Sequence, residues 1–203
     1  MTPEAFLQLV RQRTDLDLLG LCLHDAEPPF VFETKPVSWD TFREALTSNL
    51  PITREDIRIV GSARLGFSMR PGRNLRLFAD TSDIDLVVVN AALFDELWGA
   101  LLTAAYPRHP ITGILGGWLV HRRNEIYTGW LSPPQMRLDK TIFGAKATPV
   151  LEFRTKWFNA LKEASRHPPR RHEDIQGRLY RTWRHAELYH LHSLGELRRS
   201  LSL

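Results

Sequence analysis

The sequence predicts an α/β (α+β) fold in which a mixed sheet forms the core and an α-helical C-terminal region follows it. Two short apolar segments, residues 57–60 and 83–89, have the length and composition of buried strands. The segments around them repeat apolar residues at helical spacing, and helical patterns dominate the end of the chain. We therefore expect a first domain of residues 1–148, with the sheet and N-terminal helices, and a helical region of residues 149–203.

The composition is that of a globular protein, because 43% of the 203 residues are hydrophobic and 25% are charged. No apolar run reaches the roughly 18 residues that a membrane-spanning helix needs. The opening MTPEAFLQLVRQR lacks the basic-then-apolar order of a signal peptide. The single cysteine, Cys22, lies in an apolar run and excludes an internal disulfide or a cysteine-rich zinc site. We expect a cytoplasmic protein, most simply a bacterial one.

The N-terminal half begins with two predicted helices. Residues 3–13 have a proline in the first turn, and Ser38 can cap a helix over residues 39–50. The strand over residues 57–60 follows, and SARLGF at residues 62–67 predicts a short helix after a tight turn. The sheet is thus expected to begin just before this turn.

The middle of the chain alternates loop, strand and helix. Residues 68–82 are polar and contain Pro-Gly, so they predict an exposed loop. A buried strand over 83–89 and an amphipathic helix over 91–106 follow. The aromatic and β-branched residues of 117–131 predict one or two strands in a hairpin-like unit, and residues 132–149 predict irregular structure.

The C-terminal region is expected to be helical throughout. Residues 150–166 have helical spacing, and the prolines that follow end this helix. Residues 172–203 then predict one long helix, with Gly177 and Gly195 as its weak points.

Two aspartates at the head of the second strand indicate a metal site. Alternate residues of a strand share one face, so Asp83 and Asp85 project together while Ile84 and Leu86 project to the other side. Two neighbouring carboxylates repel each other unless a cation lies between them. Hard oxygen ligands favour Mg²⁺ or Mn²⁺. Two such ions about 3.5–4 Å apart can bind both the attacking and the leaving oxygen of a phosphoryl displacement.

A Gly-Ser pair at the end of the preceding strand predicts a phosphate site. Gly61 lets the backbone pass close to a ligand. Ser62 and the N–H groups after it open the predicted short helix, whose positive end attracts phosphate. Each feature alone is common in turns and strand starts, whereas the order strand, Gly-Ser, short helix, loop and SDIDLVVV is much more specific.

This order resembles the nucleotidyltransferase fold of the DNA polymerase beta superfamily, closely over residues 57–89 and loosely through the helix that ends near Tyr106. The resemblance implies a nucleotidyltransferase-like first domain and a helical region that closes over the base and ribose. It also implies a small stand-alone protein of the kind found in bacterial toxin–antitoxin and antiphage defence modules.

The resemblance assigns roles to five residues. Gly61, Ser62 and Arg64 are expected to bind the phosphates of a nucleoside triphosphate, and Asp83 and Asp85 are expected to bind Mg²⁺ or Mn²⁺ and to be catalytic. The loop between Ser62 and Asp83 is longer than in minimal members, so an insertion is expected over the site.

In the family, a third carboxylate from a later strand activates the acceptor hydroxyl. Glu125 is the single acid in VHRRNEIYTGWL and is the catalytic candidate, although an aspartate is more usual. Asp139 is a poorer candidate because it lies in a predicted loop. Glu125 can instead form an exposed ion pair with Arg122 or Arg123.

The basic residues are unevenly distributed in a chain of net charge +4. Residues 166–184 contain six arginines, which indicates either a phosphate-bearing partner or a solvated basic helix face. Five residues share one face of the predicted long helix: Arg178, Arg181, His185, Tyr189 and His192. This face either contacts the phosphates or the base of a ligand, or is a basic surface exposed to solvent. Further candidates for triphosphate binding are Lys140, Lys146 and Lys156.

Three functions follow from these residues. The first is Mg²⁺-dependent transfer of a nucleoside monophosphate from an NTP to a hydroxyl of a protein, a nucleic acid, a second nucleotide or a small molecule. The second is an inactive module of the same fold that binds nucleotide or a partner protein and regulates an effector. The third is a nucleic-acid-binding protein that uses residues 166–199, which the retention of both aspartates disfavours.

Overall fold

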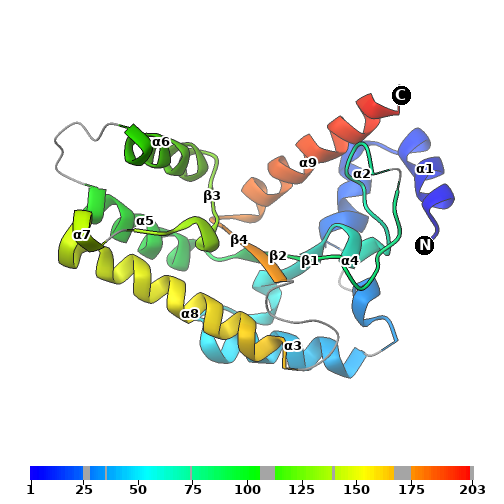
Figure 1. Cartoon of the computed structure of the whole chain (residues 1–203). Helices are drawn as coiled ribbons and strands as arrows, with labels where there is room; N and C mark the ends of the chain where they lie inside the picture. Colours follow the sequence, from blue (N-terminus) through cyan, green and yellow to red (C-terminus); the bar gives the residue numbers. More distant parts are fainter. Residues whose placement is uncertain are drawn as a thin grey trace.

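The structure is a computed structural model that describes residues 1–24, 28–34, 36–73, 75–105, 113–138, 140–166 and 175–201 (Figure 1). The strands are β1 Ile57–Val60, β2 Ile84–Val89, β3 Trp130–Leu131 and β4 Ile175–Tyr180. The α-helices are α1 Pro3–Gln12, α2 Asp15–Leu19, α3 Pro36–Asn49, α4 Ser62–Leu65, α5 Ala91–Ala105, α6 Gly113–Tyr127, α7 Lys140–Phe143, α8 Thr148–Ala164 and α9 Trp183–Ser200. Short 3₁₀ turns at Phe30–Phe32, Arg54–Asp56, Pro133–Gln135 and Gly144–Ala147, and a π-helical turn at Gly20–His24, complete the described elements.

The four strands form one mixed sheet in the order β1-β2-β4-β3. β1 is antiparallel to β2, β2 is parallel to β4, and β3 is antiparallel to β4. The parallel pair aligns Asp85 with Gln176 and Val87 with Arg178. The chain is therefore a mixed α/β protein with a mixed sheet, as the sequence predicts.

Each face of the sheet has its own hydrophobic cluster, because strand residues alternate between the faces. One face carries Ile84, Leu86 and Val88 and packs with α3, α5 and α8. The opposite face carries Val87 and Val89 and packs with α1, α2 and α9. Figure 1 shows α3 and α8 below the sheet and α9 above it, with both termini on the same side. The aspartates belong to the face of α9, since they alternate with Ile84 and Leu86.

Several predicted elements are confirmed, and single capping residues explain where two of the helices begin or end. The strand over 57–60, the short helix after Gly61 and the helices α5 and α8 are present. Asn90 starts α5 because its side chain accepts a hydrogen bond from the backbone N–H of Leu93, at 2.9 Å. Gly66 ends α4 at φ 89°, a left-handed conformation that favours glycine. In the described part of the chain, no helix combines the length and apolarity needed to cross a membrane.

The predicted strands over residues 117–131 are wrong for all but two residues. The segment belongs to α6 up to Tyr127, and β3 contains Trp130 and Leu131 alone. Gly129, at φ 75°, reverses the chain between the two elements, and its missing side chain leaves room for the imidazole of His185. The aromatic and β-branched residues that predicted strands therefore lie mostly on a helix, because tertiary packing overrides propensity.

The predicted long helix over residues 172–203 is also wrong in its first part. Residues 175–180 form β4, and α9 begins only at Trp183. The C-terminal region is therefore not helical throughout, and its strand lies inside the sheet of the first region. Gly177 is on β4, where a Cβ would come within 2.6 Å of the buried Trp157 ring of α8.

Gly177 provides a test of how β4 packs on α8. Replacing it with valine forces a branched side chain against the Trp157 ring, so we expect a loss of about 1–3 kcal/mol in the free energy of unfolding. The matched control is Gly195→Ala on α9, where a Cβ has open space and should be neutral or slightly stabilising. Urea denaturation of both variants measures the difference, and equal stabilities would contradict the β4–α8 contact.

Candidate functional site

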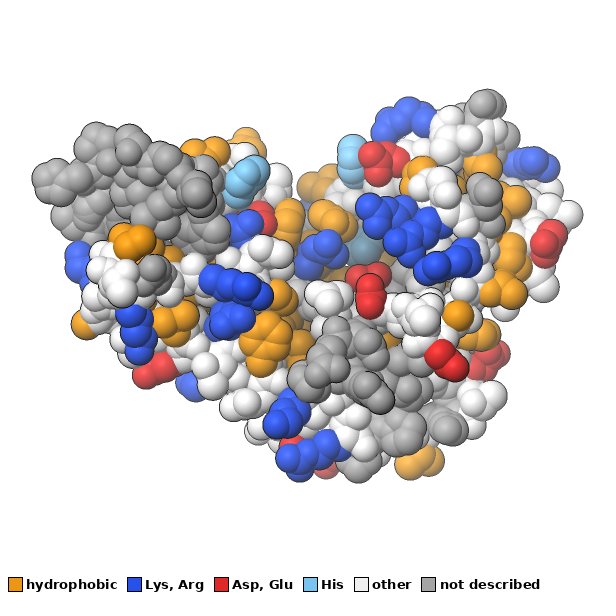
Figure 2. All heavy atoms as spheres, viewed as in Figure 1, with side chains coloured by type: hydrophobic (Ala, Val, Ile, Leu, Met, Phe, Trp, Pro, Cys, Tyr) orange, Lys and Arg blue, Asp and Glu red, His pale blue; other side chains and the backbone are white. Residues whose placement is uncertain are grey.

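A cleft of ≈ 470 Å³ opens on the α9 face of the sheet, within the size range of small-molecule sites. Three parts of the chain line it: the turn after β1 with the start of β2, the segment between them, and β4 with α9. The lining includes Gly61, Ser62, Arg70, Arg73, Arg76, Asp83, Asp85, Arg178, Tyr189, His190, Ser193 and Glu196. In Figure 2, blue basic side chains border red acidic ones near the middle of this view.

The turn after β1 comes into close contact with Asp85. Gly61 has φ +66° and ψ −144°, a conformation that is essentially restricted to glycine. A Cβ at this position would lie 3.1 Å from Oδ2 of Asp85. Ser62 follows and lines the same cleft. The predicted juxtaposition of Gly61 and Ser62 with the aspartates is therefore present, although α4 is a single turn and contributes little helix dipole.

The two aspartates differ in exposure. Asp83 is exposed, whereas Asp85 is partly buried. Burial raises the pKa of Asp85 above its ordinary value, and the negative charge of Asp83 adds to this effect, while Arg178 and Arg70 oppose it. Among the described residues, neither carboxylate has a hydrogen bond or an ion pair. The carboxylates thus remain available to a ligand.

The pair fits a hard divalent cation. Within the described chain, no group of three or more His, Cys, Asp and Glu side chains is gathered closely enough to hold a metal ion. Mg²⁺ does not need such a group, because it commonly binds one or two carboxylates together with water and substrate phosphates. Asp83 and Asp85 are the carboxylates that would hold such an ion, and the bare Cα of Gly61 leaves space beside Asp85.

Part of the segment between β1 and β2 lines the same cleft as the aspartates. We call residues 66–78 the arginine lobe; residue 74 is outside the described part. Its base is closed by a bridge between Phe67 and Leu77, and by hydrogen bonds from Ser68 N–H to the Arg76 carbonyl and from Phe78 N–H to the Gly66 carbonyl. These contacts hold the two ends of the lobe together.

Three arginines of this lobe line the cleft, and the sequence analysis did not identify them. Arg70, Arg73 and Arg76 are spaced by three residues. Arg73 N–H donates a hydrogen bond to the Arg70 carbonyl, and Arg76 N–H donates one to the Arg73 carbonyl. The first bond closes a turn with Pro71 and Gly72 at its centre, as type II turns prefer. The R-P-G-R-N-L-R pattern was the signal that could have identified a structured basic loop.

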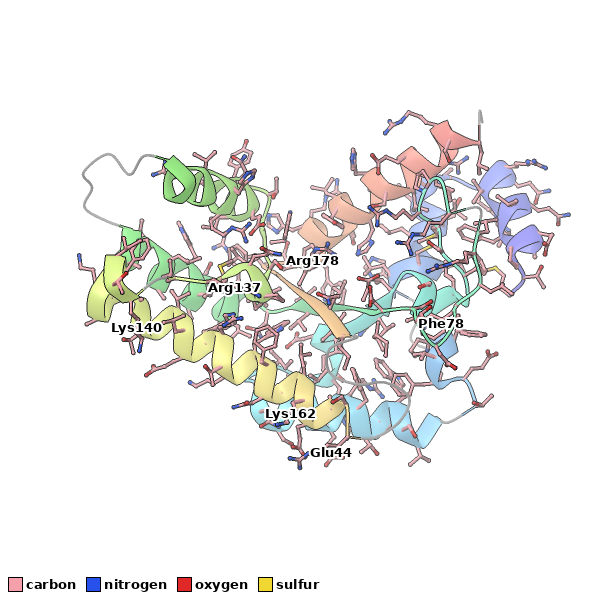
Figure 3. The ribbon with its side chains drawn as sticks, in the orientation of Figure 1. Glu44, Phe78, Arg137, Lys140, Lys162 and Arg178 are labelled. Atoms are coloured by element: carbon pink, nitrogen blue, oxygen red, sulfur yellow. The ribbon has the colours of Figure 1, made fainter. Side chains whose placement is uncertain are left out.

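The third wall comes from β4 and α9. Arg178 extends from β4 toward α9 (Figure 3), and its guanidinium lies 5.0 Å from the ring centroid of Tyr189. His190 has a buried Nε2 without a hydrogen-bond partner in the described structure, and burial together with nearby positive charge lowers its pKa to about 4. This imidazole is therefore neutral near pH 7. Ser193 and Glu196 continue the wall along α9.

Two predicted site residues are not brought into this cleft. Arg64 lines a different hollow and donates a hydrogen bond to the carbonyl of Leu21, at 3.4 Å. Glu125 is buried on α6, where its Oε1 pairs with Arg122 at 2.8 Å. Burial raises the pKa of Glu125 to about 7, although Arg122 lowers it in part. Contrary to the prediction, Glu125 lies on a helix rather than on a strand.

The predicted basic stripe does not form as one surface. Of its members, Arg178 and Tyr189 reach the cleft, whereas Arg181 pairs with Asp95 and His185 hydrogen-bonds Thr182. The cleft lining does not include the predicted lysines; Lys140, for example, lies on α7, far from Phe78 at the base of the arginine lobe (Figure 3). Asp139 and residues 167–174 of the basic cluster are outside the described residues.

Comparison of the chain with protein-family models, with curated proteins and with solved structures finds no match. The function of the cleft must therefore be argued from its own residues.

The raised pKa of Asp85 predicts a pH-dependent cost to folding. Because the folded pKa exceeds the unfolded one, the stability contributed by this group is lost as pH rises through the folded pKa. We expect Asp85→Asn to raise the melting temperature at pH 7 in EDTA, and the gain to shrink as the pH approaches about 4. Asp83→Asn, at an exposed position, should gain less. A loss of stability in Asp85→Asn at pH 7 would contradict the assigned environment.

Proposed function

We propose that this chain is a nucleotidyltransferase of the DNA polymerase beta type, which binds an NTP with a divalent cation and transfers its nucleoside monophosphate to a hydroxyl acceptor. The observation that supports this proposal is the placement of Gly61 directly against Asp85, in one cleft with Ser62 and Asp83. Phosphoryl transfer needs groups that hold phosphate and groups that hold a metal ion, and the proposal assigns the first role to Gly61 and Ser62 and the second to the two aspartates.

Each group in the cleft has a role in the proposed reaction. Gly61 and Ser62 seat the triphosphate, and Asp83 and Asp85 hold Mg²⁺ or Mn²⁺. The cation would supply charge stabilisation to the phosphoryl oxygens. The acceptor oxygen forms a bond to the α-phosphorus, the bond to the β-phosphate oxygen breaks, and pyrophosphate leaves. The acceptor proton must pass to a base, and Glu196 is the remaining acid among the described lining residues.

The α9 wall suits the nucleoside. Tyr189 offers an aromatic ring, while neutral His190 and Ser193 offer hydrogen-bonding groups on one helix. These groups lie in the same cleft as Asp83 and Asp85, so a nucleotide could contact them while its phosphates remain near Ser62. Such a wall agrees with a C-terminal region that closes over the base and ribose.

The position of Glu125 favours a second candidate, an inactive module that binds nucleotide or a partner and regulates an effector. The carboxylate expected to activate the acceptor is buried in an ion pair with Arg122, outside the cleft. In this case the protein binds the metal and the nucleotide but does not turn over. Defence or toxin–antitoxin modules are the proposed setting for either candidate.

Binding is tested by thermal unfolding with each NTP, with and without MgCl₂. We expect Mg²⁺-dependent stabilisation, about 2.7 kcal/mol at a ligand concentration one hundred times Kd. The Asp83→Asn/Asp85→Asn variant should lose it. The charge-matched control Glu4→Gln/Glu152→Gln removes two exposed carboxylates elsewhere and should retain it. If NTP with Mg²⁺ stabilises the aspartate variant as much as this control, the metal site is not at Asp83 and Asp85.

Transfer is tested with α-labelled NTP and candidate acceptors. If the chain is an active transferase, label should pass to an acceptor in a reaction that Asp83→Asn abolishes. Since Glu125 lies outside the cleft, Glu125→Gln should retain NTP binding and turnover. Metal-dependent NTP binding without labelled product from any acceptor supports the regulatory module instead.

A further inference from the structure

We infer that the arginine lobe is an oligophosphate clamp: Arg73 and Arg76, with Arg70, bind the phosphate chain of the nucleotide donor directly. The inference rests on the proposed function and makes it more specific, because it predicts selection for a triphosphate over a monophosphate. The three arginines lie on the insertion between Ser62 and Asp83, outside the residues that the family resemblance assigned.

The charges of the lobe point to an anionic ligand. Among the described residues, none of the three guanidinium groups forms an ion pair with an acid. They line one concave cleft, so an anion that enters it can contact more than one of them. A guanidinium offers paired donors that match phosphate oxygens. A chain of linked phosphates can contact several of them together.

The backbone that carries these side chains is ordered before a ligand binds. The bridge and hydrogen bonds at the base of the lobe, and the hydrogen bonds from Arg73 N–H to the Arg70 carbonyl and from Arg76 N–H to the Arg73 carbonyl, restrain the backbone at the three arginines. Less ordering free energy is then lost on binding.

The position of the lobe favours a nucleotide over a nucleic-acid backbone. The arginines share their cleft with Asp83 and Asp85, the site proposed for the reacting phosphate, and with Ser62. Phosphates linked to that reacting group must therefore lie within the same space, whereas a polynucleotide would need a row of charges that extends outside it.

Inorganic tripolyphosphate tests the clamp without a nucleoside, and EDTA removes the contribution of any metal. We expect calorimetry to detect tripolyphosphate binding to the full chain, with monophosphate binding much weaker. Arg73→Gln/Arg76→Gln should weaken tripolyphosphate binding by roughly tenfold or more for each guanidinium. Arg70 is kept, because its charge also acts on Asp85. The control Arg11→Gln/Arg123→Gln removes two exposed arginines from α1 and α6 and should bind normally.

The binding results test the clamp separately from the proposed transferase function. Equal tripolyphosphate affinity in the lobe variant and the control overturns the clamp, even if NTP binding with Mg²⁺ persists. Loss of tripolyphosphate binding in the lobe variant supports the clamp, even if the full chain transfers no nucleotide. If the lobe variant loses binding to a short single-stranded RNA but keeps tripolyphosphate binding, the lobe is a nucleic-acid contact and the clamp is wrong.

Discussion

The parallel pairing of β4 with β2 is the constraint on which the rest of the structure depends. It places a strand from the C-terminal region between β2 and the two-residue β3. The sheet is therefore complete only when residues 175–180 join the strands that precede them in the chain. The pairing also fixes the alternation of both strands, which sends Ile84 and Leu179 into one core while Asp85 and Arg178 face the other side. The cleft therefore results from the register of one strand pair.

The sequence identified the local part of the fold well. β1, the turn at Gly61, β2 and α5 follow one another closely, and each has its own signal in apolar run, glycine or helical spacing. β4 was missed because Leu179, Trp183 and Ala186 continue at helical spacing, so the pattern of α9 extends backward into the strand. Residues 175–180 form a strand because of contacts that are distant in sequence. They pair with one edge of β2, and Gly177 leaves room for the Trp157 ring of α8.

The candidate site also has a part that local sequence patterns predict and a part that depends on distant elements. Gly61, Ser62 and the two aspartates are close in sequence, and strand alternation alone places the acids together. Glu125 and Arg64 do not line this cleft. Their positions depend on elements whose type or side had to be known, α6 in one case and the far side of α4 in the other. The walls of the cleft come from a loop and from α9, whose approach to β2 no local pattern specifies.

The late position of β4 in the chain has a consequence for synthesis on the ribosome. β2 is made long before its partner, and it carries the consecutive residues Val87, Val88 and Val89, a segment with high β-propensity. Until residues 175–180 emerge, one edge of that strand lacks its native neighbour and is open to pairing with other chains. A nascent or truncated chain without the last segment would therefore be prone to aggregation, and it would also lack the Arg178 and α9 sides of the cleft.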